Sequence, residues 1–340
     1  MLLIDIPSIT TLLHKTTVPG FLQQLVDVLE EDYGRWPEFA HSPRPAYHAK
    51  ENGKEVGVIE LMPTSDGKLY SFKYVNGHPQ NTTKGLLNVV AFGCLADVNT
   101  GYPLMIAEMS VLTALRTAGA SAMAAKHMAN KGGKQAIIGC GAQAEFQVLA
   151  MAAVCGLTEV AYYDRDPATM QKFAANLAPY ANLKLHAAKN VADAVKDCQV
   201  VTTATAAKSR TEIVPSDAVQ AGVHYNGIGG DTPGKTEFSV PTLQRCKIAV
   251  QYEPQTRVEG EIQQLPKDFP VTELKDIVKG AKVRTADSDI TMFDSVGYAL
   301  EDFSILRLVY KLACEYRIGI DTALLPEPKD PKDLFGILNT

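Results

Sequence analysis

The sequence predicts an α/β protein made of a doubly wound parallel sheet and a second, smaller α+β domain. Three observations predict this. Short strand-like and helix-like segments alternate from residue 136 to residue 313, and a glycine-rich turn joins the first of these strands to the helix after it. The first 115 residues instead hold strand-like segments broken by proline and glycine. A chain of 340 residues, 46% of them hydrophobic, is long enough for two domains.

Residues 1–115 are expected to form the smaller domain, around an antiparallel or mixed sheet. A helix over residues 18–35 precedes four segments rich in the β-branched and aromatic residues of strands. These strands are predicted at Val56–Met62, Leu69–Val75, Asn88–Asp97 and Leu104–Glu108. The proline-rich C-terminal segment, residues 315–340, is expected to return to this domain or to cap a partner subunit.

An alanine- and methionine-rich segment, Val111–Met128, predicts a helix in which the second domain begins, at residue 116. This domain is expected to run to residue 314. Its strands are predicted at Ala136–Ile138, Glu159–Tyr163, Leu183–His186, Val200–Ala204, Gly222–Gly227, Ile248–Tyr252 and Thr291–Phe293. Its helices are predicted at Gln143–Cys155, Pro167–Leu177, Val191–Lys196 and Val296–Ala313.

The turn after the strand Ala136–Ile138 fits the dinucleotide-binding pattern G-x-G-x-x-A. Gly139 permits the tight turn, and Gly141 lets the backbone approach a pyrophosphate. The small Ala144 lets the following helix pack on the strand, so that the helix N-terminus faces the anion. The strand before and the helix after favour a Rossmann-type nucleotide site over an ordinary turn that uses glycine for its backbone freedom.

Asp164 ends the next strand, 25 positions after Gly139, where a carboxylate binds both ribose hydroxyls of a dinucleotide. This favours NAD over NADP. Arg165 complicates the preference, because an arginine here is able to hold a 2′-phosphate. The alternative for Asp164 is a turn residue at the end of a strand.

A second glycine-rich segment, residues 224–237, follows a late strand and is expected to lie over the nicotinamide position. Its Asp231 is suited to carry protons to and from an amine during hydride transfer, or is an ordinary turn aspartate. In the first domain, Arg44 and Lys73 are able to clamp a carboxylate. For these two cations, and for Glu60, solvated strand faces are the alternative.

Composition excludes several classes of function. The 33 basic and 38 acidic side chains give a net charge of -5 without a basic block, so nucleic acid is not an expected partner. No apolar run is long enough to span a membrane and no signal peptide is evident, which predicts a soluble, cytoplasmic protein. Six scattered cysteines and the histidines His78 and His224 show no metal-ligand spacing, so neither a metal nor a disulfide framework is expected.

Several segments resemble the ornithine cyclodeaminase/mu-crystallin family, and together they cover nearly the whole chain. The segments are Gly57–Pro63, Phe72–Pro79, Ala114–Thr117, Gly229–Asp231, Pro233–Glu237, Tyr252–Arg257, Glu259–Pro266 and Phe293–Gly297. Those that contain Glu-Leu-Met-Pro and Glu-Gly-Glu-Ile-Gln-Gln-Leu-Pro are similar to the cyclodeaminase branch in particular.

The resemblance implies a homodimer whose first domain carries the substrate and the subunit contact, and whose Rossmann domain binds NAD. It implies conversion of L-ornithine to L-proline and ammonia without net redox change. Hydride leaves Cα for NAD, the δ-amine attacks the resulting imine, ammonia departs, and hydride returns to the cyclic imine.

The resemblance also implies residue roles. Arg44 and Lys73 would bind the substrate carboxylate, and Val296 would line the substrate pocket. Asp231 would be the catalytic acid and base, and Glu60 would act near an amino group. With Gly139 and Gly141, the cofactor-binding residues would be Asn88, Arg116, Ala142, Gln143, Asp164, Thr205, Tyr225, Asn226, Gly227, Ile228, Lys235 and Ser295. Cys140 and the pair Gly227-Ile228 depart from the family pattern, which bears on pocket size rather than chemistry.

Other functions stay open. A lysine cyclodeaminase would differ by one methylene of substrate, worth about 1–3 kcal/mol in a pocket. A ketimine or cyclic-imine reductase, or an amino-acid dehydrogenase, would consume or release a reduced cofactor. A non-catalytic nucleotide-binding protein would need none of Arg44, Lys73 and Asp231.

Overall fold

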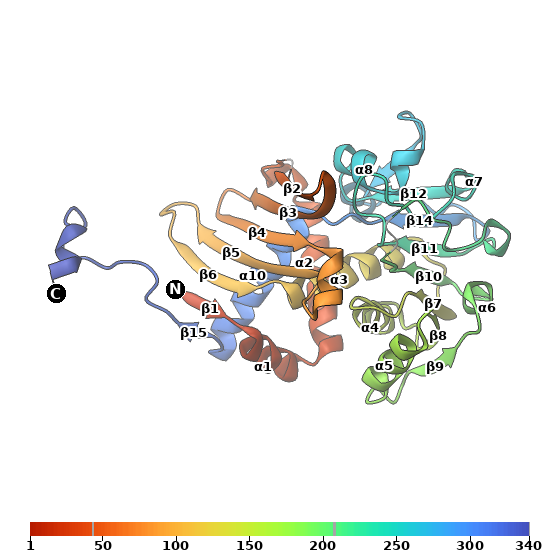
Figure 1. Ribbon diagram of the computed structural model, residues 1–340, viewed down its shortest axis with the longest axis horizontal. Coiled ribbons are helices and arrows are strands. Elements are labelled where there is room, and N and C mark those ends of the chain that lie inside the picture. The colour runs from red at the N-terminus through yellow and green to blue at the C-terminus, as the bar shows by residue number, and fades with distance from the viewer. Residues whose placement is uncertain (43, 207–208, 340) are drawn as a thin grey trace.

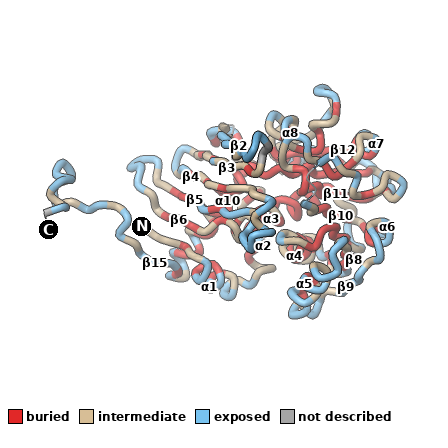
Figure 2. Tube along the Cα trace, in the orientation of Figure 1, coloured by how far each residue is buried: buried red, intermediate tan, exposed pale blue. Residues whose placement is uncertain are grey.

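The computed structural model describes residues 1–42, 44–206 and 209–339, and these form two sheets with helices packed between and around them (Figure 1). The buried residues concentrate where helices meet the two sheets, while the exposed residues follow the outer loops and the C-terminal segment (Figure 2).

The first sheet has seven strands and combines both strand directions. Strands β1 and β6 are parallel and the other neighbouring pairs are antiparallel, which confirms the predicted antiparallel or mixed sheet. In spatial order the strands are β15 (Ile320–Asp321), β1 (Leu2–Ile4), β6 (Pro103–Glu108), β5 (Val89–Asp97), β4 (Leu69–Gly77), β3 (Lys54–Ser65) and β2 (Ala46–Glu51).

Strand β4 shows how this sheet divides its two faces. Ser71, Lys73 and Val75 are buried at alternate positions, whereas Tyr70, Phe72 and Tyr74 point to the other face. The helix α10 (Ala299–Tyr316) packs on β3, β4 and β5. The period of two therefore directs Lys73 to the helix-covered face, although it interrupts an apolar strand.

The second sheet has eight strands, and every neighbouring pair is parallel, as predicted. Its spatial order is β13 (Val271–Glu273), β12 (Cys246–Val250), β14 (Ile290–Asp294), β11 (His224–Gly227), β10 (Val200–Thr203), β7 (Lys134–Ile138), β8 (Glu159–Tyr163) and β9 (Lys184–Ala187). The chain runs outward from β7 to β9 and then crosses to β10. The switch point between β7 and β10 is where open α/β sheets bind ligands.

The helices lie close to their predicted positions. The long helix α3 (Ser110–Met128) contacts the N-terminal helix α2 (Val18–Gly34), α4 of the second sheet and α10, so it joins the two halves. The remaining helices are α1 (Ile6–Thr16), α4 (Ala144–Cys155), α5 (Pro167–Leu177), α6 (Val191–Val195), α7 (Val240–Gln244), α8 (Glu253–Glu259) and α9 (Leu274–Val278). Single-turn 3-10 helices lie at Trp36–Glu38, Pro79–Lys84, Ser216–Ala218, Glu261–Gln264 and Phe335–Asn339.

The N-terminal strand and the segment after α10 meet on the first sheet. Strand β15 pairs with β1, so the segment after α10 does reach this sheet. Beyond it, the chain extends away from the body (Figure 1) and exposes Leu334, Phe335 and Leu338.

Candidate functional site

The predicted cofactor residues of the second sheet lie at one edge. The glycine-rich turn follows β7, Thr205 follows β10, Ile228 follows β11, and Ser295 follows β14. Because these strands are parallel, their carboxyl ends share one edge, next to the switch point. The backbone ties this edge together: the amide of Ile228 donates to Thr203, and that of Ser295 donates to Gly227 at 3.0 Å.

The glycine-rich turn has the geometry that a pyrophosphate requires. Gly139 has a φ of 93°, and a Cβ there would lie 2.7 Å from the carbonyl oxygen of Ala204, so glycine is required. A Cβ on Gly141 would meet nothing within 4 Å, which leaves room for a ligand beside this amide. The side chain of Cys140 is buried, and burial raises the pKa of its thiol to about 12, so it is not a reactive thiolate.

Asp164 holds the same turn. One carboxylate oxygen accepts a hydrogen bond from the amide of Cys140 at 2.8 Å, and the other accepts from the amide of Asp166 at 2.9 Å. The carboxylate therefore lies directly beside the glycine-rich turn, in the position that its spacing predicts.

Two other predicted cofactor residues present unused polar atoms. The side-chain oxygens of Asn88 and Gln143 are buried, and neither has a hydrogen-bond partner in the part of the chain that the structure describes. Such atoms are commonly satisfied by a ligand or water. The open space at Gly141 and the unpartnered oxygen of Gln143 in the same turn fit a bound dinucleotide.

Tyr225 and Asn226 contribute to the core of the sheet. The Tyr225 ring is fully buried and packs edge-on against Phe238. The Asn226 amide is also buried, bonded to Thr202 and His224. These side chains stabilise β11, so any contact of these residues with a cofactor would be made by their backbone.

Arg44 connects the two halves of the site. Its guanidinium lies 3.2 Å from Glu60 on β3, pairs with Glu259 at the end of α8, and donates to the backbone carbonyl of Asp231 at 3.4 Å. Burial raises the pKa of Glu259, Arg44 opposes the increase, and the nearby Glu60 and Asp231 add to it. The structure thus brings Arg44, Glu60 and Asp231 together.

Lys73 is deeply buried, with only 1% of its side chain exposed, so the alternative of a solvated strand face is wrong for this residue. Its ammonium pairs with Asp302 of α10 at 2.9 Å. The pKa of Lys73 is lowered to about 8, chiefly by burial and also by the charges of Arg116 and Arg44, while Asp302 opposes the decrease. The three cations therefore lie near one another.

Arg116, predicted to bind the cofactor, is buried among acids of α10. It pairs with Glu301 at 2.9 Å and Asp302 at 3.0 Å, and Tyr33 donates to the other oxygen of Glu301. A Cβ on Gly297 would lie 2.5 Å from the guanidinium. Since Gly297 follows Val296, the predicted lining residue Val296 lies close to these cations.

Asp231 itself is about half exposed and pairs with Lys235, a predicted cofactor residue, at 2.9 Å. Thr205 is held by Glu237, which accepts hydrogen bonds from both its amide and its hydroxyl. Ser295 pairs with Gln251. Thr205 and Ser295 are therefore anchored by side chains outside the predicted set, whereas Asp231 pairs within it.

Sequence reasoning missed Glu259, Glu301 and Asp302, which bind the predicted cations. Glu259 lies in a segment that resembles the family, but the resemblance assigned no function to any residue of that segment. The adjacent acids Glu301 and Asp302 stand at the start of an apolar helix, and such a pair indicates buried cationic partners.

The remaining features concern metal ligands, a buried histidine and membrane spans in the residues that the structure describes. No group of histidine, cysteine or acidic residues among them is arranged to hold a metal. His224 is fully buried and bonds to Thr291 and Asn226, as expected of a structural histidine. Of the helices that the structure describes, none is long and apolar enough to cross a membrane.

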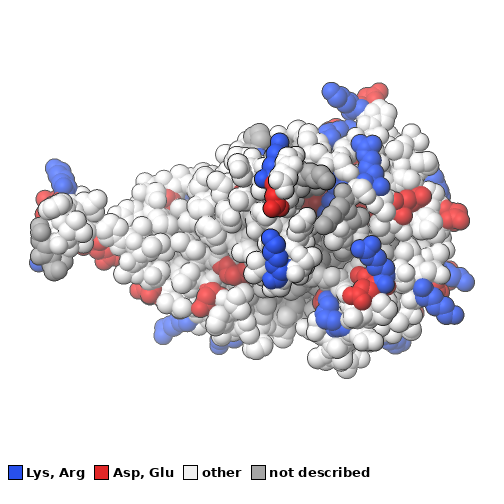
Figure 3. All heavy atoms as spheres, viewed as in Figure 1, with Lys and Arg blue, Asp and Glu red and all other residues white. Residues whose placement is uncertain are grey.

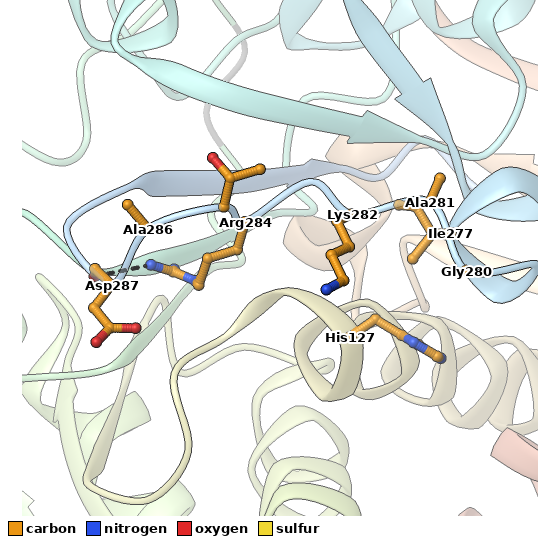
Figure 4. Close-up of a pocket in the computed structure, with 9 residues that line it drawn as sticks. His127, Ile277, Gly280, Ala281, Lys282, Arg284, Ala286 and Asp287 are labelled. Carbon is orange, nitrogen blue, oxygen red and sulfur yellow. Dashed lines mark hydrogen bonds between the residues drawn. The ribbon is translucent and has the colours of Figure 1, made fainter.

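A separate cleft of about 380 Å³ lies at the amino end of β14, remote from the candidate site (Figure 4). His127 of α3, Lys282 and Arg284 line it. Arg284 donates to the backbone carbonyls of Met128, Asp287 and Asp289, so it fastens this loop to α3. None of the predicted site residues lines this cleft.

Comparison with known proteins identifies relatives along the whole chain. The model of the ornithine cyclodeaminase/mu-crystallin family matches residues 8–316. An ornithine cyclodeaminase of Brucella suis is 48% identical over 337 residues, which cover 98% of this chain and 92% of that protein.

Solved structures of similar fold include a lysine cyclodeaminase that recognises L-lysine, L-ornithine and L-2,4-diaminobutyric acid. It matches with a TM-score of 0.90 and 26% identity over 98% of both chains. The Δ1-pyrroline-2-carboxylate reductase of Thermococcus litoralis, solved with NADH and L-proline, matches with a TM-score of 0.86 and 27% identity over 95% of this chain and 100% of the other. The chain belongs to the ornithine cyclodeaminase/mu-crystallin family.

Proposed function

We propose that this protein is an ornithine cyclodeaminase that uses NAD to convert L-ornithine to L-proline and ammonia. The observation that carries the proposal is Arg44, which reaches Glu60 of the first sheet and the backbone of Asp231 of the second. A carboxylate-binding cation thereby lies beside the Glu60 carboxylate and against the backbone of the loop that carries Asp231. The similarity of this chain to the ornithine cyclodeaminase of Brucella suis supports ornithine as the substrate.

In this proposal, residues 1–115 provide most of the substrate site and residues 116–314 provide the cofactor site. Arg44 and Lys73 bind the substrate carboxylate, with Val296 against the carbon chain. Arg44 is paired with Glu60 and Glu259, so a substrate carboxylate competes for the same guanidinium. This exchange keeps the buried cation paired at each stage.

Asp231 acts as the acid and base of the reaction. Its half-exposed carboxylate is held by Lys235 at one oxygen and is close enough to Glu259 to influence its pKa. It accepts a proton from the α-ammonium group, so that Cα is able to lose hydride, and later returns a proton to the departing nitrogen. Glu60 orients an amino group of the substrate by charge.

The residues that would hold NAD are Asn88, Gln143, Asp164 and those of the glycine-rich turn. When bound, NAD would accept one hydride and later return it. The net reaction converts one ornithine to one proline and one ammonia, so the atoms balance without an external oxidant or reductant. The solved relative that holds NADH and L-proline supports a cofactor and a product of this kind.

A homodimer is part of the proposal. The outer face of the first sheet is apolar and exposed at Leu61, Tyr70, Val90 and Phe92. The visible surface over this sheet carries few charges, whereas basic and acidic side chains intermingle over the second sheet (Figure 3). Uncovered apolar surface of this kind is typical of a subunit contact.

The proposal also places the protein in the cytoplasm. The six free cysteines fit its reducing conditions.

The test follows ammonia, proline and pipecolate after the protein is mixed with L-ornithine or L-lysine and catalytic NAD. Equal amounts of ammonia and proline are expected from ornithine. A preference for L-lysine would instead identify the protein as a lysine cyclodeaminase. Inactivity with both, combined with NADH consumption on Δ1-pyrroline-2-carboxylate, would assign the reductase.

A further inference from the structure

Three buried carboxylates link the loops of the second sheet in a defined order. The carboxylate of Asp294, at the end of β14, accepts hydrogen bonds from the amides of Glu261 and Ile262, both at 2.9 Å. The carboxylate of Glu261 accepts from the amides of Glu237 and Phe238, at 2.6 and 3.1 Å. Each carboxylate thus fixes the backbone of the residue that carries the next one.

The last carboxylate, Glu237, holds two segments of the candidate site at once. It accepts a hydrogen bond from the amide of Gly229 at 2.9 Å, and from the amide of Thr205 at 2.8 Å. The hydroxyls of Thr203 and Thr205 donate to it as well. Gly229 is two residues from Asp231, so this carboxylate ties the loop of the proposed acid and base to a predicted cofactor residue.

Each carboxylate also occupies the space beside a glycine. A Cβ on Gly229 would lie 2.3 Å from a Glu237 oxygen, and one on Gly230 would lie 2.5 Å from a Glu261 oxygen. A Cβ on Gly260 would lie 2.6 Å from an Asp294 oxygen. The glycines before Asp231 are therefore explained by close approach of carboxylates, because none of these three has a positive φ.

We propose that Asp294, Glu261 and Glu237 form a carboxylate relay of positioning residues that places the Asp231 loop against the cofactor site. The inference rests on the proposed function for the role of Asp231. The relay runs from β14, beside Ser295 and Val296, through the 3-10 helix at residues 261–264 to the loops after β10 and β11. It sets the position of Asp231 relative to Thr205 and Val296 without contact between the relay and the substrate.

Burial and charge are consistent with a dedicated arrangement. All three side chains are fully buried, and burial raises the pKa of each carboxyl group. Backbone amides that donate to each carboxylate oppose this increase. Burying three acids near one another is costly, and their hydrogen bonds to loop backbone amides indicate that this cost maintains the positions of the loops.

The test measures kcat and KM for L-ornithine, together with the Kd for NAD, in Glu261→Gln. Glu261 forms no side-chain hydrogen bond with Asp231 or Thr205, so its effect reaches the site through Glu237 and through its close approach to Gly230. Misplacement of a reacting group by about 1 Å costs on the order of 100-fold in rate. We expect kcat to fall about 100-fold while KM changes less than about threefold, because the substrate-binding cations belong to the other half of the site.

Asp289→Asn is the matched control. Asp289 lies at the amino end of β14 and its carboxylate also accepts two backbone amide hydrogen bonds, both at 2.8 Å. It is far from the carboxyl edge. We expect this variant to lose thermal stability and to keep kcat and KM. Equal losses of kcat in both variants would assign the relay a general structural role and overturn the proposal.

Thr203→Val is the second variant, for the case in which Glu261→Gln does not fold. It removes one hydrogen bond of Glu237 and retains the side-chain volume, and a several-fold decrease in kcat at unchanged KM is expected. Unchanged kcat would contradict the relay. Inactivity of the wild type on ornithine would refute the proposed function separately. Glu237→Gln would then still test the relay through NAD binding. The Kd for NAD should rise about tenfold because Thr205 is released, and an unchanged Kd would overturn the relay.

Discussion

The two halves of the candidate site are built by different means. The half on the first sheet and α10 consists of long charged side chains, with Arg44, Lys73 and Arg116 paired to acids. The half on the second sheet consists of backbone and glycines, which buried carboxylates hold in place. Changes in the first half should alter charge and hence substrate binding, whereas changes in the second half should alter geometry and hence turnover.

The largest expected effect is on turnover, from Asp231→Asn in the second half. Loss of a general acid and base lowers rates by about 10²–10⁴-fold. We expect kcat to fall within this range while calorimetry shows the Kd for NAD unchanged, because an asparagine at this position still offers Lys235 a hydrogen-bond acceptor. Full activity would remove Asp231 from the mechanism.

Arg44→Gln breaks the first half by removing its bridging charge. A hydrogen bond to a charged group contributes about 1.5–3 kcal/mol, so KM for L-ornithine should increase about 10- to 100-fold. The decrease in kcat should be smaller than that of Asp231→Asn.

Arg35→Gln is the control for Arg44, because Arg35 is also an ion-paired guanidinium, bound to Asp32 and Asp66 away from the site. Its KM should match that of the wild type. A variant at Arg44 that lowers kcat and leaves KM unchanged would contradict the division between the two halves.

Lys73 predicts a pH dependence of binding. Its pKa is about 8 in the folded protein, well below the usual value, so the ammonium loses its proton as the pH rises through 8. If it binds the substrate carboxylate, KM for ornithine should rise above pH 8, by about tenfold per pH unit at the limit. Lys73→Arg should remove this rise, since a guanidinium stays charged. A KM that stays flat from pH 7 to pH 9 would exclude Lys73 from the clamp.

The smallest expected effect is on stability, from Asp294 in the second half. Burial raises the pKa of this carboxyl group to about 7. The folded protein therefore binds its proton more tightly than the unfolded chain, and stability should fall as pH rises from about 4 to 7. Thermal melts should show a Tm that decreases over this window, and a smaller decrease in Asp294→Asn. An identical pH profile in both proteins would contradict the assigned pKa.

The second sheet was largely predictable because its signals are local. The turn Gly139–Ala144 directly follows an apolar strand, and the alternation of short strands and helices defines a parallel sheet. Strand β2 (Ala46–Glu51) was missed, since its exposed and largely polar residues show no buried face. The sheet pairing of β2 with β3, rather than its own pattern, makes it a strand.

The first half of the site could be predicted only in part. Lys73 stood out because it interrupts an apolar strand, but its partner Asp302 lies 229 residues away. No local pattern links the two, and only the packing of α10 on β4 brings them together. The relay was hidden for the same reason, because its glycines and carboxylates lie in three separate segments.

The most direct test of the central claim is the fate of deuterium from L-ornithine labelled at Cα. The protein is incubated with the labelled substrate and catalytic NAD, and the proline is analysed by mass spectrometry. Because the same bound cofactor accepts and returns the hydride, deuterium should be retained at Cα of proline without net NADH formation. Proline without deuterium, or NADH released in proportion to ammonia, would contradict the cyclodeaminase assignment.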